Sequence, residues 1–81
     1  MKKILVNNTF GQNLQKIRYS KDLTQEQTAA KLQLLGSPMS RDVYAQIETG
    51  KGNIYISDLV GLQQVFNVDF AEFFEGVPTA R

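Results

Sequence analysis

The 81-residue sequence contains no cysteine and no histidine. Their absence removes disulfides, thiolate and imidazole metal ligands, the two corresponding nucleophiles, and the general base that enzymes use most often. The carboxylates offer no substitute, because no pair of them accompanies a plausible nucleophile or a set of metal ligands. We therefore expect a protein that is not an enzyme and that has no metal, cofactor or evident small-molecule ligand.

Long apolar runs are also missing. No stretch approaches the roughly 20 apolar residues that a membrane-spanning helix needs. The opening "MKKILVNNTF" has only three consecutive apolar residues, too few for a signal peptide. A chain of 81 residues with 42% apolar content fits one compact domain. We expect a cytoplasmic protein with no membrane partner and no separate effector domain.

The net charge of +1 conceals an asymmetry along the chain. Residues 1–51 contain eight Lys and Arg against four Asp and Glu, which gives +4. Residues 52–81 contain one Arg against four acids, which gives −3. A basic half suits a polyanionic partner such as a nucleic acid, but chance explains so small an asymmetry equally well.

Apolar spacing and turn signals predict five short helices. Phe10, Leu14 and Ile17 have the spacing of one helical face and place a first helix at about residues 9–21. Thr24 and Gln27 have the pattern of a capping box, which begins a second helix. This helix is expected to bury three residues and to end at a glycine and proline stop signal: Thr28, Leu32 and Leu35, then Gly36 and Pro38.

Ser40 is expected to cap a third helix, which Gly50 ends in a left-handed conformation. Ser57 and Asp69 are expected to cap a fourth and a fifth helix. The apolar residues that these three helices turn inward are expected to be Val43, Tyr44 and Ile47, then Leu59, Leu62 and Phe66, then Phe70, Phe73 and Phe74.

Two segments have strand-like composition, "KILV" at residues 3–6 and "NIYI" at residues 53–56. An isolated pairing of two strands is marginally stable in water. We therefore expect both segments to be extended connections between the five helices.

The outward face of the third helix carries side chains that suit DNA recognition. A helical wheel places five residues away from the core: Arg41, Asp42, Ala45, Gln46 and Thr49. Arg is a forked donor to guanine, Gln pairs with adenine, Asp accepts from the cytosine amine, and a small alanine permits contact with a thymine methyl. The same residue types populate ordinary solvated helix faces. Composition alone thus allows either a DNA-reading face or a solvated one.

Two motifs distinguish these alternatives. "LTQEQTAAKL" at residues 23–32 looks like "LTQEELAEKL", and "IETGK" at residues 47–51 looks like "IExGK". In this order, and with these helices around them, they resemble the phage-repressor type of helix-turn-helix domain, the Cro and XRE class, over about residues 9–75. The resemblance implies an all-α, compact five-helix bundle with a lambda-repressor-like DNA-binding domain. Residues 1–8 would form an N-terminal arm and residues 76–81 a C-terminal tail.

The resemblance also implies a partner, which is double-stranded DNA bound by a homodimer with the third helix in the major groove. The residues that match base-reading positions are Ser40, Arg41, Asp42, Ala45 and Gln46. The residues that match phosphate-contacting positions are Thr24, Gln25, Thr49 and Lys51. Structural alternatives exist for several of them: Thr24 is a helix cap, Asp42 favours a helix N-terminus, and Lys51 suits a turn.

Arg18 and Glu48 each lie at the flank of an apolar helix face and are expected to meet. The resemblance implies that they form a partly buried ion pair between the first and third helices. We therefore assign both residues to structure, and neither to catalysis nor to DNA contact.

The sequence departs from the family pattern in two places. Thr28 stands where leucine is usual, which either weakens a core contact or adds a hydroxyl bond to the helix backbone. The connection at residues 33–39 is longer than the commonest form. The tilt of the third helix, and with it the choice of base-reading side chains, is therefore left open.

Four phenylalanines lie near the C-terminus: Phe66, Phe70, Phe73 and Phe74. A small domain either buries them or leaves one or two for a dimer surface. The first eight residues are either an arm that contacts DNA through Lys2 and Lys3, a strand that pairs across a dimer, or a disordered end, with disorder as the default.

The combined features predict a sequence-specific DNA-binding transcriptional regulator, a repressor that acts by occupying an operator. One alternative is the antitoxin of a toxin-antitoxin pair, which adds a toxin-binding surface to the same DNA contacts. Another is a helical protein-interaction module that does not bind DNA.

Overall fold

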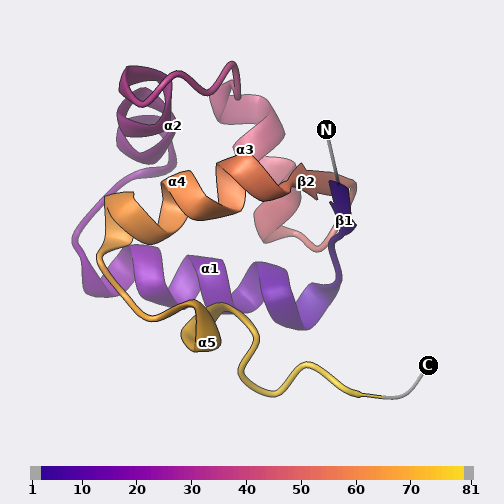
Figure 1. The fold of residues 1–81 in the computed structure, drawn as a ribbon. Helices are drawn as coiled ribbons and strands as arrows, with labels where there is room; N and C mark the ends of the chain where they lie inside the picture. The colour runs from indigo at the N-terminus through magenta and orange to yellow at the C-terminus, as the bar shows by residue number, and fades with distance from the viewer. Residues whose placement is uncertain (1–2, 80–81) are drawn as a thin grey trace.

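A computed structural model describes residues 3–79, and this range contains five helices and two short strands. In chain order the elements are β1 (Lys3–Leu5), α1 (Asn8–Ser20), α2 (Gln25–Leu34), α3 (Arg41–Glu48), β2 (Asn53–Tyr55), α4 (Ile56–Phe66) and α5 (Phe70–Phe73). In Figure 1, α1 and α4 cross the molecule together, with α2 beside α4 and α5 on the other side of α1, while α3 packs against α1 and α2. The expected all-α class is confirmed, with the two strands as an addition to it.

The core is built from side chains of all five helices, of β2, and of the segments after β1 and before α3. Its buried members are Val6, Phe10, Leu14, Ile17, Leu32, Met39, Tyr44, Ile47, Ile54, Leu59, Leu62, Phe66 and Phe73. Burial of an aliphatic or aromatic side chain contributes roughly 1.5–3 kcal/mol. α3 supplies Tyr44 and Ile47 to this core, so the free energy of burial anchors the helix that the sequence assigns to DNA.

Local hydrogen bonds explain where α1 and α2 begin. The Phe10 amide donates to the Asn7 side chain over 2.8 Å, which places the start of α1 within one residue of the expected position. The Gln27 amide donates to Thr24 Oγ1 over 3.0 Å, and the Thr24 amide donates to Gln27 Oε1 over 2.9 Å. The predicted capping box of α2 is confirmed.

The inner face of α2 differs from the prediction at one position. Thr28 and Leu32 are buried as expected, but Leu35 is exposed because the helix ends at Leu34. Ala29 is buried in its place. The Thr28 hydroxyl donates to the Thr24 carbonyl over 2.9 Å, so the departure from the usual leucine adds a bond within the helix.

The two segments expected to be free connections form a small antiparallel sheet. Residues 3–5 pair with residues 53–55, with Ile4 opposite Ile54, and the Val6 amide donates to the Gly52 carbonyl over 3.0 Å. The pairing survives because Ile54 and Val6 are buried in the helical core, which an isolated pair of strands lacks. The default expectation of disorder is wrong for residues 3–8, while Lys2 lies outside the described residues.

The last two helices correct several expected caps and core positions. α4 begins at Ile56, one residue before the predicted cap Ser57. Asp69 precedes α5, but its side chain makes no capping hydrogen bond. Phe73 is buried, whereas Phe70 and Phe74 are exposed, because α5 has only four residues and turns one aromatic ring inward.

Close contact between α1 and α3 depends on Gly11. A Cβ atom at this position would lie 2.5 Å from the Glu48 carbonyl oxygen and 2.6 Å from that of Ile47. A side chain of any size would therefore push the two helices apart. The predicted elements gave no sign of this contact, because it joins residues far apart in the sequence.

Within residues 3–79, no helix combines the length and apolar character that crossing a membrane requires.

Candidate nucleic-acid interface

α3 has a defined start and a defined end. The Val43 amide donates to Ser40 Oγ over 3.2 Å, which confirms Ser40 as the N-cap. Gly50 has φ of 82°, and its amide donates to the Ile47 carbonyl over 2.9 Å. The Lys51 amide then donates to the Gln46 carbonyl over 3.2 Å, which closes the helix with the predicted left-handed glycine.

Four of the five residues assigned to base reading lie in or beside α3 with exposed side chains: Ser40, Arg41, Asp42 and Gln46. Ala45 is half-buried beside them. Arg41 and Asp42 approach each other to 3.8 Å, but both side chains are largely exposed, so this pair is weak and easily opened. Their assignment to DNA bases stays a prediction.

The structure corrects the predicted apolar face of α3. Val43 was expected in the core, but its exposed fraction is 45%. Glu48 takes the buried position instead, because Tyr44, Ile47 and Glu48 form one contiguous face that turns Val43 to its edge. An apolar side chain is therefore present on the surface of the helix assigned to DNA.

A buried ion pair joins α1 to α3. Arg18 Nε lies 2.6 Å from Glu48 Oε2, and Arg18 Nη2 donates to Glu48 Oε1 over 3.0 Å. The third nitrogen, Nη1, donates to the Leu23 carbonyl over 2.9 Å, just before α2. The two residues are 5% and 6% exposed. The Arg18 guanidinium therefore connects all three helices of the helix-turn-helix region. The expected ion pair joined only the first and third of them.

Glu48 is held in its charged form. Burial alone would raise the pKa of its carboxyl, but hydrogen bonds from Arg18 and Gln25, together with the nearby Tyr44 hydroxyl, outweigh burial and lower that pKa below its usual value. Burial and the nearby Glu48 carboxylate raise the pKa of the Tyr44 phenol. The Gln25 amide donates to Glu48 Oε1 over 3.1 Å, a link that sequence reasoning missed.

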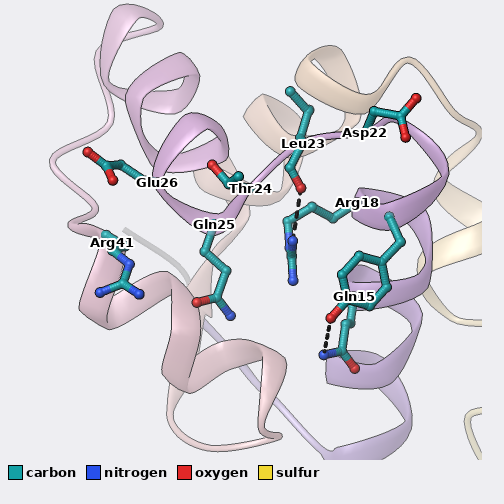
Figure 2. Close-up of a pocket in the computed structure, with 9 residues that line it drawn as sticks. Gln15, Arg18, Asp22, Leu23, Thr24, Gln25, Glu26 and Arg41 are labelled. Atoms are coloured by element: carbon teal, nitrogen blue, oxygen red, sulfur yellow. Dashed lines mark hydrogen bonds between the residues drawn. The ribbon is translucent and has the colours of Figure 1, made fainter.

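A hollow of about 660 Å³ lies between the first three helices. Its lining includes Thr24 and Gln25 at the start of α2 and Arg41 at the start of α3. Figure 2 shows Arg41 and Glu26 on one side of this hollow and Gln15 and Arg18 across from them. The structure thus brings two of the predicted phosphate contacts next to one of the predicted base contacts.

The charges of the hollow limit its attraction for phosphate. Asp22 and Glu26 contribute carboxylates to the lining, and Glu48 neutralises Arg18. Arg41 is therefore the main source of positive charge there. Neutral donors such as the Gln25 amide can bind a phosphate oxygen without adding net charge.

The other two phosphate candidates lie at the far end of α3. Thr49 follows the helix, and its hydroxyl donates to the Gln46 carbonyl over 2.6 Å. Lys51 is exposed in the turn after Gly50. Both lie more than two helical turns along the chain from Arg41, so the nine candidates are spread over α3, the turn after it and the start of α2.

The long connection before α3 is held in place by a buried side chain. Met39 is part of the core, and its carbonyl accepts from Gln33 Nε2 over 2.9 Å. Its amide donates to Ser37 Oγ over 3.1 Å. These contacts define the tilt of α3 that the sequence left open, and the only local signal for them was an apolar residue directly before the cap.

The phenylalanine cluster is divided between core and surface. Phe66 and Phe73 are fully buried, so they are not available to a second copy of the chain. Phe70 and Phe74 are 42% and 39% exposed, and the Phe74 ring lies 5.6 Å from that of Phe10. The predicted dimer surface therefore reduces to these two residues.

Comparison with known proteins agrees with this geometry. A helix-turn-helix family model matches residues 14–73. The restriction-modification controller protein C.AhdI from Aeromonas hydrophila has a similar crystal structure, with a TM-score of 0.72 and 25% sequence identity. The match covers 83% of this chain and 94% of that one. No curated protein matches the sequence significantly. The chain belongs to the helix-turn-helix family of the Cro/C1 type and is a sequence-specific DNA-binding transcriptional regulator.

Proposed function

We propose that this regulator represses transcription as a homodimer that occupies an operator, with one α3 in the major groove of each half-site. One observation carries the proposal. α3 is anchored by Tyr44, Ile47 and the buried Arg18–Glu48 pair, while Arg41, Asp42 and Gln46 remain exposed. A rigidly supported helix with a polar outer face suits direct readout of base edges.

The start of α2 supports the same docking mode. Thr24 and Gln25 lie beside Arg41 around one hollow, so a helix that enters the groove would bring α2 against the DNA backbone. Thr49 and Lys51 extend the backbone contacts to the other end of α3. In this proposal Ser40, Arg41, Asp42, Ala45 and Gln46 face bases, and the four phosphate contacts set the register.

The test begins with selection of bound fragments from random DNA, followed by mobility shifts on the selected site and on random duplex. Affinity should fall steeply as the salt concentration rises. Arg41→Ala should lose about 1–3 kcal/mol on the selected site, if Arg41 binds a guanine, and much less on random duplex. Lys16→Ala removes one positive charge from an exposed position of α1 and serves as the matched control.

Two results would contradict the proposal. Failure of the protein to shift any duplex at low salt would favour a protein-interaction module without DNA binding. An equal loss for Arg41→Ala on both DNAs would assign Arg41 to the backbone and not to a base.

The neighbouring genes would distinguish two more specific roles, which are control of restriction-modification genes and action as an antitoxin. The likeness to C.AhdI favours control of neighbouring restriction-modification genes. A hollow of about 640 Å³ between α2 and α4, lined in part by Leu35, Pro38 and Tyr55, favours the antitoxin role, because a toxin needs an apolar contact surface. A neighbouring methyltransferase gene supports the first role, and a neighbouring toxin-sized reading frame supports the second.

A further inference from the structure

Val43 is an exposed apolar side chain on a helix whose other outward side chains are mainly polar. Its exposed fraction is 45%, and it is absent from the buried core cluster. The two methyl groups of Val43 are therefore not part of the buried core. The wheel of α3 places Val43 next to Gln46, three residues on, and next to Ile47, four residues on. Val43 is thus at the edge of the outward face, beside a proposed base-reading side chain.

The major groove offers one apolar group for such a side chain. Each A·T pair presents the C5-methyl of thymine there, together with the donor and acceptor of adenine that a glutamine amide matches. A valine in a helix has essentially one rotamer, so it meets a methyl group with little loss of side-chain freedom. Gln46 and Val43 side by side are therefore complementary to the two recognisable features of A·T pairs.

Ala45 is a weaker candidate for the same contact. It lies on the other side of Gln46, it is half-buried, and its single methyl group extends less far from the helix. Val43 is more exposed and longer, so with α3 in the groove it would extend further toward the bases than Ala45.

We propose that Val43 is a specificity-determining residue that contacts the C5-methyl of a thymine next to the base read by Gln46. This inference rests on the proposed placement of α3 in the major groove. The contact would give the protein a preference for thymine at one position of each half-site. This preference would come from the removal of apolar surface from water and not from a hydrogen bond.

The experiment uses the full chain and an operator selected from random DNA. Each thymine of one half-site is replaced in turn by deoxyuridine, which lacks only the C5-methyl. Wild-type protein should lose affinity about fourfold at one position, the equivalent of one methyl group withdrawn from water. Val43→Ala should bind the thymine and deoxyuridine duplexes equally at that position, and Val43→Thr, which keeps one methyl group, should retain part of the difference.

The matched control is Val60→Ala, the same change on α4 at an exposed fraction of 40%. It should leave the discrimination between thymine and deoxyuridine at its wild-type value. Thermal melting of each variant checks that α3 is still folded.

Three outcomes would overturn the inference. If no deoxyuridine weakens wild-type binding, no methyl group is read. If deoxyuridine weakens Val43→Ala as much as wild type, another residue reads the methyl, with Ala45 the next to test. If the wild-type protein selects no DNA at all, the proposed function itself fails. This result is distinguishable from the first two outcomes, because both of those require a selected operator.

Discussion

Glu48 is the residue through which three parts of the helix-turn-helix region are connected. It lies at the end of α3 and accepts hydrogen bonds from Arg18 on α1 and from Gln25 at the start of α2. A buried charge with these partners is stable, but a buried charge without them is not. The Glu48 carboxylate therefore holds the three helices of the helix-turn-helix region together.

Replacement of Glu48 by alanine should destabilise the protein strongly. The change leaves the Arg18 guanidinium buried without its partner, at a cost of about 3–5 kcal/mol. For a domain of this size such a loss lowers Tm by roughly 12 °C or more. Calorimetry or circular dichroism melting measures it, with Glu75→Ala as the control because Glu75 is exposed. An unchanged Tm for Glu48→Ala would refute the structural role of the pair.

Stability should also depend on pH through Glu48. Its pKa is lowered in the folded state, so the unfolded chain binds this proton at a higher pH than the folded one. The stabilisation is fully present above the ordinary glutamate pKa of about 4.3 and is lost as pH falls through the lowered value. The difference in free energy of unfolding between wild type and Glu48→Gln should therefore shrink below about pH 4. Urea unfolding at a series of pH values measures it, and a difference independent of pH would contradict the assignment.

At the scale of elements, the orientation of α3 depends on contacts with α1 and with the connection before it. Gly11 lets α1 approach the backbone of Ile47 and Glu48, and Met39 anchors the connection in the core. Neither Gly11 nor Met39 is a residue of α3. The angle at which α3 presents its outward face is therefore a property of its neighbours.

Gly11→Ala should separate α1 from α3. The added Cβ would lie 2.5 Å from a carbonyl oxygen, which the backbone must move to relieve. Tm should fall, and affinity for the selected operator should fall more than affinity for random duplex, because tilt of α3 changes base contacts first. Gly61→Ala is the control: its Cβ would meet side-chain atoms of Leu32 at 3.0 Å and of Leu35 at 4.0 Å but no backbone atom, and both changes raise helix propensity alike. Equal melting temperatures for the two variants would show that the close approach of α1 and α3 at Gly11 does not contribute to stability.

At the scale of the whole molecule, one domain presents a single α3 and few free positive charges. Arg41 and Lys51 are exposed near the ends of α3, whereas Glu48 neutralises Arg18. Non-specific binding by such a surface is weak, with Kd of about 10⁻⁴–10⁻⁶ M at physiological salt. Two copies on adjacent half-sites would supply the additional contacts that useful affinity needs.

Exposed Phe70 and Phe74 are the proposed contacts between these copies. Phe70→Ser should shift the protein from dimer toward monomer in sedimentation equilibrium and weaken operator binding, because it removes apolar area from the interface. Leu34→Ser, at the exposed end of α2, is the control and should leave the dimer intact. If Phe70→Ser and Phe74→Ser both remain dimeric, the interface lies elsewhere on the molecule.

Local chemistry was enough to predict the helix-turn-helix region. The Thr24 capping box, the Ser40 cap and Gly50 each depend on hydrogen bonds or backbone angles within a few residues. The sequence by itself therefore determined where α2 and α3 begin and how α3 ends, and its motifs identified the family. The division of the chain at residues 8 and 75, and the assignment of residues to DNA, stay predictions.

Contacts between distant residues were decided only by the tertiary structure. Residues 3–5 pair with residues 53–55 because Val6 and Ile54 find a helical core to enter, which no local pattern records. Val43 is exposed because Glu48, paired with a residue thirty positions away, takes the buried edge of α3. Burial depends on neighbours that folding brings together, so only the tertiary structure decided which side chains the outward face of α3 exposes.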